Sequence, residues 1–319
     1  MRKALKMGLL LATLATAVAQ TPKDALAPAK AALQDGEADK ALSLLSSLPP
    51  SAESRNLKCR VFFTLERWDE ATGECEQAVH LDSQNAVNHL WLGRALGEKA
   101  DNASFMAAYS LAKRTRAEFE QAVILDPHNA EAIADLGEFY TSAPGVVGGG
   151  TDKAERLVAQ MEKIDAARAH QLRGRIAESR KDLGTAEQEY KQAITVGEHP
   201  SFEWMTLASF YRKHERWTDM EAAVQSGYKA AQRDKHAGVA LYNGASILSR
   251  GHINLSLAAK MLEEYLTGNS KTEEAPAFEA HTRLARIKAQ IGDVPGAWQE
   301  RAAALQLAHD YKPALALKF

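Results

Sequence analysis

Residue types that carry catalysis and metal binding occur throughout this chain, but few of them have the spacing that such chemistry requires. The 319-residue sequence contains no H-E-x-x-H or C-x2-C spacing for a metal ion and no G-x-S-x-G turn for a serine nucleophile. Its ten histidines are scattered, and His128 with Glu131 lacks the third ligand that a metal site needs. No pair of carboxylates is distinguished from the many acidic residues of polar helix faces. We therefore predict no catalytic residue, no metal site and no cofactor.

A glycine-rich turn, APGVVGGGTD at residues 143–152, has a composition that suits an anion at a helix N-terminus. A phosphate-binding P-loop would need a lysine before Thr151 and a strand ahead of the turn. Gly150 takes the lysine position, and a helix is expected before the turn. We therefore exclude nucleotide binding and expect a long turn in which Thr151 or Asp152 caps the next helix.

Composition and charge are those of a soluble folded protein. Hydrophobic residues make up 45% of the chain and charged residues 25%, and the formal net charge is -2. This charge gives no electrostatic reason to expect a nucleic-acid partner, because phosphate backbones are bound by strongly basic surfaces. Alanine is common and proline is scarce, which favours helices.

The first 19 residues have the organisation of a secretory signal peptide. Three basic residues precede an apolar run that is too short to span a bilayer, and the segment ends on a small-x-small cleavage signal at residues 17–19. We predict cleavage near Ala19. No later segment is long and apolar enough to cross a membrane, so the mature chain is expected in the periplasm or outside the cell.

Apolar residues recur along residues 20–319 at a spacing that predicts paired helices. Trp204, Leu207, Ala208 and Tyr211 give the spacing W-x2-L-A-x2-Y, and a second apolar stripe follows after a turn. The pattern resembles the tetratricopeptide repeat family, and the same frame fits around residues 59, 89, 133, 170 and 281 and more weakly at 25–48 and 241–265. The resemblance implies an all-α, right-handed superhelical solenoid of about eight helical hairpins. Residues 309–319 are expected to cap its C-terminal end.

Close packing within each hairpin is expected to depend on small residues. Gly93, Gly137 and Gly174 on first helices would meet small residues of second helices such as Ala154 and Ala186. Two units, 86–127 and 130–165, are irregular because they carry extra residues at 97–113 and 144–150. The first insertion predicts either a lengthened helical pair or a segment that projects over the groove to contact a ligand. The turn in the second resembles a P-G-x-x-G-G-x-x-K-A segment found in periplasmic solenoids associated with some solute transporters.

The repeat frame also places the two cysteines. Cys59 takes the small position of a first helix and Cys75 the inner face of the second helix, so the two face each other within one hairpin. Because an exported chain meets an oxidising compartment, we predict a disulfide between them. The alternative is a pair of buried thiols that pack as small apolar residues.

A binding surface is implied by the same resemblance, because the first helices of tetratricopeptide proteins line a concave groove. The frame assigns the central groove position to Arg60, Arg94, Glu138, Arg175, Ser209, Ser246 and Arg286, and places Asn56, Phe63, Gln171, Met205, Arg212, Tyr242 and Arg250 beside it. Arginines and aromatic rings suit carboxylates and short acidic or mixed peptides. The alternative is that these arginines pair with acids of the chain such as Glu53, Glu131 and Glu178.

These observations lead to one functional hypothesis with an alternative. The chain is expected to be a non-enzymatic scaffold of the bacterial cell envelope that binds a protein or peptide in its concave groove. The alternative is a small-ligand-binding or transporter-associated periplasmic component, with a pocket framed by the two insertions. A protein partner predicts a broad groove, and a small ligand predicts one closed cavity near the insertions.

Overall fold

The computed structural model describes residues 22–319, so the predicted signal peptide at residues 1–19 lies outside the described residues. All regular structure in the described part is helical, and sixteen of its helices pair into eight consecutive hairpins. The first helices of the hairpins are α1 (Pro22–Gln34), α3 (Ala52–Thr64), α5 (Ala86–Asp101), α7 (Ala130–Ser142), α9 (Ala166–Ser179), α11 (Pro200–Lys213), α13 (Gly238–Gly251) and α15 (Ala277–Gln290). The second helices are α2 (Ala38–Ser46), α4 (Trp68–Leu81), α6 (Phe105–Leu125), α8 (Thr151–Met161), α10 (Leu183–Val196), α12 (Trp217–Ala231), α14 (Leu255–Thr267) and α16 (Val294–Leu307). A 3-10 turn, η1 (Gly145–Val147), precedes α8, and α17 (Lys312–Leu315) is the last helix. The predicted all-α hairpin solenoid is confirmed.

Short polar side chains begin many of these helices. The side chains of Asn85, Asn129, Asp165 and Asp293 accept hydrogen bonds from backbone N–H groups of the first turns of α5, α7, α9 and α16. Ser51 forms a reciprocal pair with Ser54 at the start of α3. Such bonds satisfy donors that a helix leaves without intrahelical partners, so the sequence fixes the start of these helices locally.

The turn inside most hairpins requires a left-handed residue. Positive φ angles occur between the paired helices at Gly36, Glu66, Lys181, Glu215, His252 and Gly292. Glycine adopts this conformation without strain, whereas an L side chain costs about 1–2 kcal/mol there. The four non-glycine turns are therefore held by the helices that they connect.

Small residues do allow the helices to approach, but their contacts differ from the expectation. A Cβ added at Gly93 would lie 2.5 Å from the ring of Phe119, and one at Gly174 would lie 2.7 Å from the ring of Tyr190. A Cβ at Gly137 would lie 2.7 Å from Leu172 of the next hairpin. The nearest side chains at these glycines are therefore the large ones of Phe119, Tyr190 and Leu172, which fill the space left by the missing side chain.

The two irregular units differ in how they take up their extra residues. In the first, α5 and α6 are lengthened, with 16 and 21 residues, while Phe105 and Met106 at the start of α6 are largely exposed. In the second, the extra residues form η1 and a turn in which Lys153 Nζ donates to Gly148 O at 2.7 Å. The N-cap of α8 is Gly150, so the expectation of a Thr151 or Asp152 cap was wrong: Thr151 is already the first helical residue.

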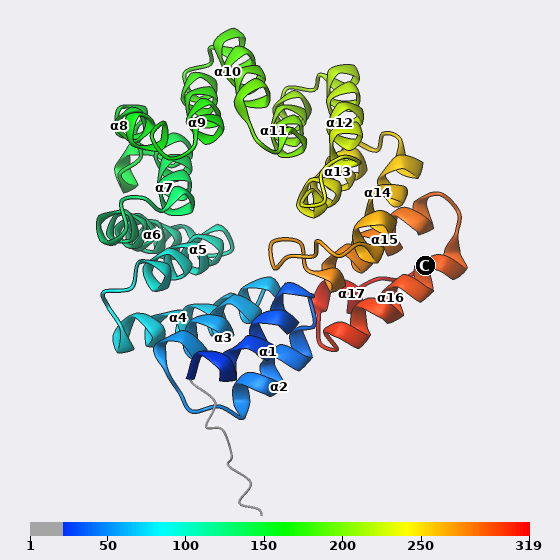
Figure 1. The fold of residues 1–319 in the computed structure, drawn as a ribbon, viewed down its shortest axis with the longest axis horizontal. Helices are drawn as coiled ribbons and strands as arrows, with labels where there is room; N and C mark the ends of the chain where they lie inside the picture. The colour runs from blue at the N-terminus through cyan, green and yellow to red at the C-terminus, as the bar shows by residue number, and fades with distance from the viewer. Residues whose placement is uncertain (1–21) are drawn as a thin grey trace, which may run out of the picture.

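The array closes on itself. Figure 1 shows the hairpins arranged as a ring in which the last helices lie beside α1 and α2. One buried cluster joins the two ends, with Leu26, Leu33 and Leu57 on one side and Phe278 and Tyr311 on the other. This contact surface between the first two hairpins and residues 277–317 is called the seam below. The segment that we expected to cap an exposed end lies within it.

Polar contacts line the edge of the seam. Arg67 Nη1 donates to Asp310 Oδ2 at 2.9 Å, and Tyr311 Oη donates to Glu66 Oε1 at 3.0 Å. The backbone N–H of His309 donates to Asp39 Oδ2 at 2.9 Å. Exposed ion pairs contribute little to stability, so the buried cluster holds most of the seam together.

The connection between α14 and α15 runs into the interior of the ring (Figure 1). This segment, residues 268–276, is called the strap below. Arg60 Nε donates to Glu273 Oε2 at 2.9 Å, which ties the strap to α3 across the ring. Tyr265 Oη donates to the carbonyl of Ala275 and holds the other end of the strap to α14.

Among residues 22–319, no helix combines the length and the hydropathy of a bilayer span.

Candidate functional site

The inner faces of the first helices enclose two cavities. Cavity 1, of about 1140 Å³, is lined mainly by α9, α11 and α13, and cavity 2, of about 1130 Å³, mainly by α3, α5 and α7. Glu273 and Glu274 of the strap line both cavities, as do Arg250 and Arg283. The strap therefore divides the interior, and each cavity is large enough for a small molecule or a short peptide segment.

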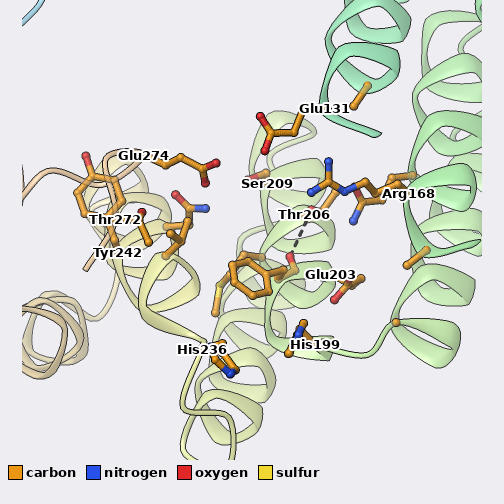
Figure 2. A pocket seen from close by; sticks show the side chains of 18 of the residues that line it. Glu131, Arg168, His199, Glu203, Thr206, Ser209, His236, Tyr242, Thr272 and Glu274 are labelled. Atoms are coloured by element: carbon orange, nitrogen blue, oxygen red, sulfur yellow. Dashed lines mark hydrogen bonds between the residues drawn. The ribbon is translucent and has the colours of Figure 1, made fainter. Parts of the chain in front are cut away.

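Cavity 1 combines charged groups of both signs. Figure 2 shows the Glu274 side chain directed from the strap into the cavity, opposite Arg168 of α9. Burial, and secondarily the nearby carboxylate of Glu131, raise the pKa of Glu274. Arg212 and Arg250 make no ion pair within residues 22–319, and burial together with Arg283 and Arg212 lowers the pKa of Arg250. The cavity thus holds positive and negative groups that form no ion pair within the described residues.

One carboxyl group on the wall of cavity 1 is buried with one of its oxygens left without a hydrogen bond from the described residues. Glu203, in the first turn of α11, is 8% exposed, and its Oε2 has no hydrogen-bond partner among the described residues. The side chain packs over Gly197, where an added Cβ would lie 2.9 Å from its carboxyl carbon. Burial, reinforced by the charge of Asp165, raises the pKa of Glu203 to about 7.

Histidine and aromatic rings surround the same end of the cavity. Figure 2 shows His199 next to Glu203 on the cavity wall, with His236 on the far side of His199. The ring of His199 lies 5.8 Å from that of His236 and 6.2 Å from that of Phe202, centroid to centroid. His199 Nδ1 lies 2.8 Å from Asp234 Oδ2, so Nε2 is the acceptor nitrogen whenever the ring is neutral.

Cavity 2 lies between the two insertions. Gly97, Ala100, Asp101 and Ala112 of the first insertion line it, as do Pro144 and Val147 of the second. Its aromatic wall comes from Phe63, Trp68 and Trp91, whose rings meet edge to face with the Phe63 ring 5.3 and 5.5 Å from the other two. This end of the interior is the more apolar of the two.

The predicted groove residues divide between the two cavities. Gln171, Met205, Arg212 and Tyr242 line cavity 1. Phe63, Arg94 and Glu138 line cavity 2. The repeat frame therefore placed most of these side chains on the inner surface of the ring, although it gave no sign that this surface is divided.

Four of the predicted groove residues line neither cavity. Asn56 is buried at 4% exposure within its own hairpin, and Arg60 is held by the strap. Arg175 pairs with Glu138 at 3.1 Å. Arg286 is exposed, while Arg283, three residues earlier, faces the interior and donates to Tyr242 Oη at 2.6 Å. Side chains three residues apart on a helix differ in direction by only about 60°. A slight rotation of α15 therefore decides whether Arg283 or Arg286 faces the interior.

Several predicted arginines are paired within the chain. Arg94 donates to Asp135 at 2.6 Å and to Glu131 at 3.0 Å, and its guanidinium lies 4.7 Å from the Trp91 ring. With Arg60 held by Glu273 and Arg175 by Glu138, this matches the alternative in which groove arginines are neutralised by acids. Within the described chain, the free positive groups of the interior are instead Arg212 and Arg250.

The two cysteines lie in the hairpin of α3 and α4. The structure joins Cys59 and Cys75 by a disulfide of 2.03 Å, and both residues are fully buried. They pack with Trp91 and Leu96 of α5. The bond therefore lies behind the wall of cavity 2 and is shielded from solvent.

Sequence analysis missed one group of possible metal ligands. In the described part of the chain, Asp39, His309 and Asp310 offer ligand atoms within 4.8 Å of one another. Each already has a partner at the seam, since His309 bonds to Asp39 and Asp310 pairs with Arg67. Asp39 and His309 are 270 positions apart, so no local spacing could have indicated the group.

Sequence analysis also missed Glu203, Glu273 and Glu274. A glutamate in a first turn is ordinary at the level of sequence, because helix N-termini favour acids. The only signal for the strap was its length, with nine residues between α14 and α15. Burial of Glu203 and the reach of the strap both depend on contacts across the ring.

Comparison with known proteins gives distant matches. No family model matches the chain. Superkiller complex protein 3 of Mus musculus is 24% identical over 300 residues, which cover 89% of this chain and 18% of that protein. This chain thus spans less than a fifth of the length of that relative.

Two solved structures are also similar. One is TTC0263, a thermophilic TPR protein of Thermus thermophilus, with a TM-score of 0.49 and 17% identity over 58% of this chain and 98% of that one. The other is the Cut9-Hcn1 hetero-tetramer of APC/C, with a TM-score of 0.41 and 11% identity over 92% of this chain and 54% of that one.

Proposed function

We propose that this chain, a solenoid of the tetratricopeptide type, is a non-enzymatic scaffold that binds a short segment of another protein inside its ring. The observation that carries the proposal is the interior of cavity 1, where Arg212, Arg250 and Glu274 line the wall without an ion-pair partner in the described chain. Charges of both signs, set among hydrogen-bonding side chains, suit a segment of mixed charge.

The proposed location is the bacterial cell envelope. Support comes from the N-terminal 19 residues, whose pattern is that of a secretory signal peptide. The disulfide between Cys59 and Cys75 agrees with an oxidising compartment. Fusion of residues 1–24 to a reporter that folds only outside the cytoplasm tests export, and an inactive reporter would rule out this location.

Site-specific photocrosslinking tests binding inside the ring. A benzophenone amino acid replaces Asn243, which lines cavity 1, or Lys229, which is exposed on α12. In an extract of native envelopes, position 243 is expected to give a discrete product that position 229 does not give. Mass spectrometry of the product identifies the bound segment.

Charge reversal in the cavity provides the control for this experiment. The double variant Arg212→Glu with Arg250→Glu is expected to abolish the crosslinked product from position 243, because acidic groups of the bound segment lose the two arginines that would pair with them. Arg233→Glu with Lys229→Glu makes the same change in net charge on the exterior and should leave the product intact. Equal products from positions 243 and 229 would show that binding does not occur inside the ring.

A second candidate function is the binding of a small ligand by a transporter-associated component. It is favoured by the position of cavity 2 between the insertions at 97–113 and 144–150. Ala100→Trp would place a large ring at the wall of this cavity. Native mass spectrometry should then find a co-purifying small molecule in the wild type and not in this variant. A wild-type protein that carries no small molecule would contradict this second function.

A further inference from the structure

We propose that the end of cavity 1 formed by Glu203, His199 and His236 is a binding site for a primary ammonium group. The ammonium would come from a lysine side chain, a peptide N-terminus or a free polyamine. The inference deepens the proposed function and rests on cavity 1 being its binding site. It adds a chemical class of ligand and a position for it.

The Glu203 carboxyl group is the first feature of this site. Its Oε2 is buried on the wall of a cavity and accepts no hydrogen bond from the described chain. A buried polar atom without a partner costs about 1–3 kcal/mol, so natural proteins rarely retain one. A donor in the cavity would recover this cost once a rotation of the Glu203 side chain brings Oε2 to the cavity surface.

The wall around Glu203 is the second feature of the site. His199 lies beside Glu203 (Figure 2), its ring adjoins those of Phe202 and His236, and its Nε2 supplies a second acceptor when the ring is neutral. Ring faces and acceptors together are the surroundings in which proteins bind ammonium groups. Two further buried oxygens without partners in the described chain, Ser246 Oγ and Thr272 Oγ1, lie elsewhere on the wall of the same cavity.

The packing of the two carboxyl oxygens of Glu203 distinguishes an ammonium from a guanidinium. A guanidinium binds a carboxylate best through both oxygens, in a planar fork. Oε1 of Glu203 packs against Gly197, where an added Cβ would lie 3.0 Å from it. With Oε2 as the oxygen that lacks a partner among residues 22–319, the site favours a compact point charge.

Charged groups facing Glu203 come from three elements. Asp165 and Arg168 lie at the start of α9, and His199 precedes α11. Asp234 and His236 lie between α12 and α13. A bound ammonium favours the ionised carboxylate, which burial disfavours in the empty site. Binding near neutral pH should therefore release a proton from Glu203.

Calorimetric titration of the full chain with small amines tests the proposal. The probes are N-acetyl-lysine methylamide, alanyl-alanine methylamide and putrescine, which represent the three sources of the ammonium. N-acetyl-norleucine methylamide lacks the charge, and N-acetyl-arginine methylamide carries a guanidinium. At pH 7.5 at least one amine is expected to bind about tenfold more tightly than either control probe.

The isosteric variant Glu203→Gln is expected to weaken binding of that amine about tenfold or more, and lowering the pH from 8 to 6 should weaken binding to the wild type by a similar factor. Glu198→Gln, at an exposed residue of the same cavity rim, is the matched control and should bind as the wild type does. Titrations in buffers of different ionisation enthalpy should show proton release for the wild type and none for Glu203→Gln.

Three results would overturn the proposal. They are equal amine affinity in the wild type and Glu203→Gln, equal loss in Glu198→Gln, and binding of the arginine probe as tight as that of every amine. None of them affects the crosslinking from position 243, so a failure here would leave the proposed scaffold function intact. Loss of the crosslink with retained amine binding would instead reject the scaffold and retain the ammonium site.

Discussion

At the scale of single residues, Glu203 links stability to pH. Its pKa is about 7 in the folded chain and near the ordinary 4.5 when unfolded, so the folded state binds more protons between these values. Stability that is present below pH 4.5 is therefore lost as the pH rises toward 7. The ionised carboxylate is the destabilising form.

Glu203→Gln should remove this loss. The variant is expected to be more stable than the wild type by about 2–3 kcal/mol at pH 8, with little difference at pH 4.5. Urea unfolding at the two pH values measures the change. A stability difference that does not depend on pH would show that Glu203 titrates normally.

The disulfide is a second feature at the residue scale that affects stability. Reduction of the bond between Cys59 and Cys75, which are 16 positions apart, should lower the free energy of unfolding by about 3 kcal/mol. Denaturant unfolding with and without a reductant measures the loss. Two free thiols per chain under denaturing, non-reducing conditions would contradict the bond.

At the scale of helices and hairpins, the left-handed turn residues offer a direct test of backbone strain. Glu215 has a φ of 56° between α11 and α12, where glycine is preferred. Glu215→Gly should stabilise the chain by about 1 kcal/mol, because it relieves this strain. Thermal unfolding measures the shift.

Gly292→Ala is the opposite change at the equivalent turn between α15 and α16. Gly292 has a φ of 89° with no described atom near the added Cβ, so steric contact does not complicate the result. The variant is expected to lose about 1 kcal/mol. If the two substitutions shift stability in the same direction, turn strain is not the cause.

Most of the hairpin architecture could be predicted from the sequence because its signals are local. The spacing of Leu207, Ala208 and Tyr211 follows the helical period, and Asp165 and Asn129 begin their helices through contacts within one turn. The choice between Arg283 and Arg286 could not be predicted, since it depends on how α15 rotates against the ring. The burial of Glu203 likewise depends on packing between hairpins.

At the scale of the whole molecule, the closure of the ring was beyond sequence analysis. A solenoid curves by a small rotation per repeat, and slight differences in that rotation decide whether its ends meet. The contacts that close this ring, such as Arg67 with Asp310, join residues 243 positions apart. No periodic pattern reports a contact of that kind.

Tyr311 is one of the large buried side chains of the seam. It is 2% exposed at the seam, and its ring lies 4.8 Å from that of Phe278. Tyr311→Ala should cost about 3–5 kcal/mol of seam stability, and this loss is expected to open the ring without unfolding the hairpins. Small-angle X-ray scattering should then show a larger radius of gyration with unchanged helicity.

Leu315→Ala is the control for this experiment, because Leu315 lies in the same segment and is 46% exposed. It should leave the radius of gyration as in the wild type. An unchanged radius in Tyr311→Ala would mean that the remaining seam contacts are sufficient for closure.

Closure also changes how the chain should lose its structure. In an open array the terminal hairpins have a single neighbour, so they fray first and the central hairpins melt last. In this ring α1 and α2 pack against the last hairpin as well as against the next one, so the ordinary starting points of melting are absent from the described chain. Amide hydrogens of α1 and α16 should therefore exchange as slowly as those of α9. Rupture of the seam becomes the single event that converts a cyclic, cooperative molecule into a linear one that melts from its ends.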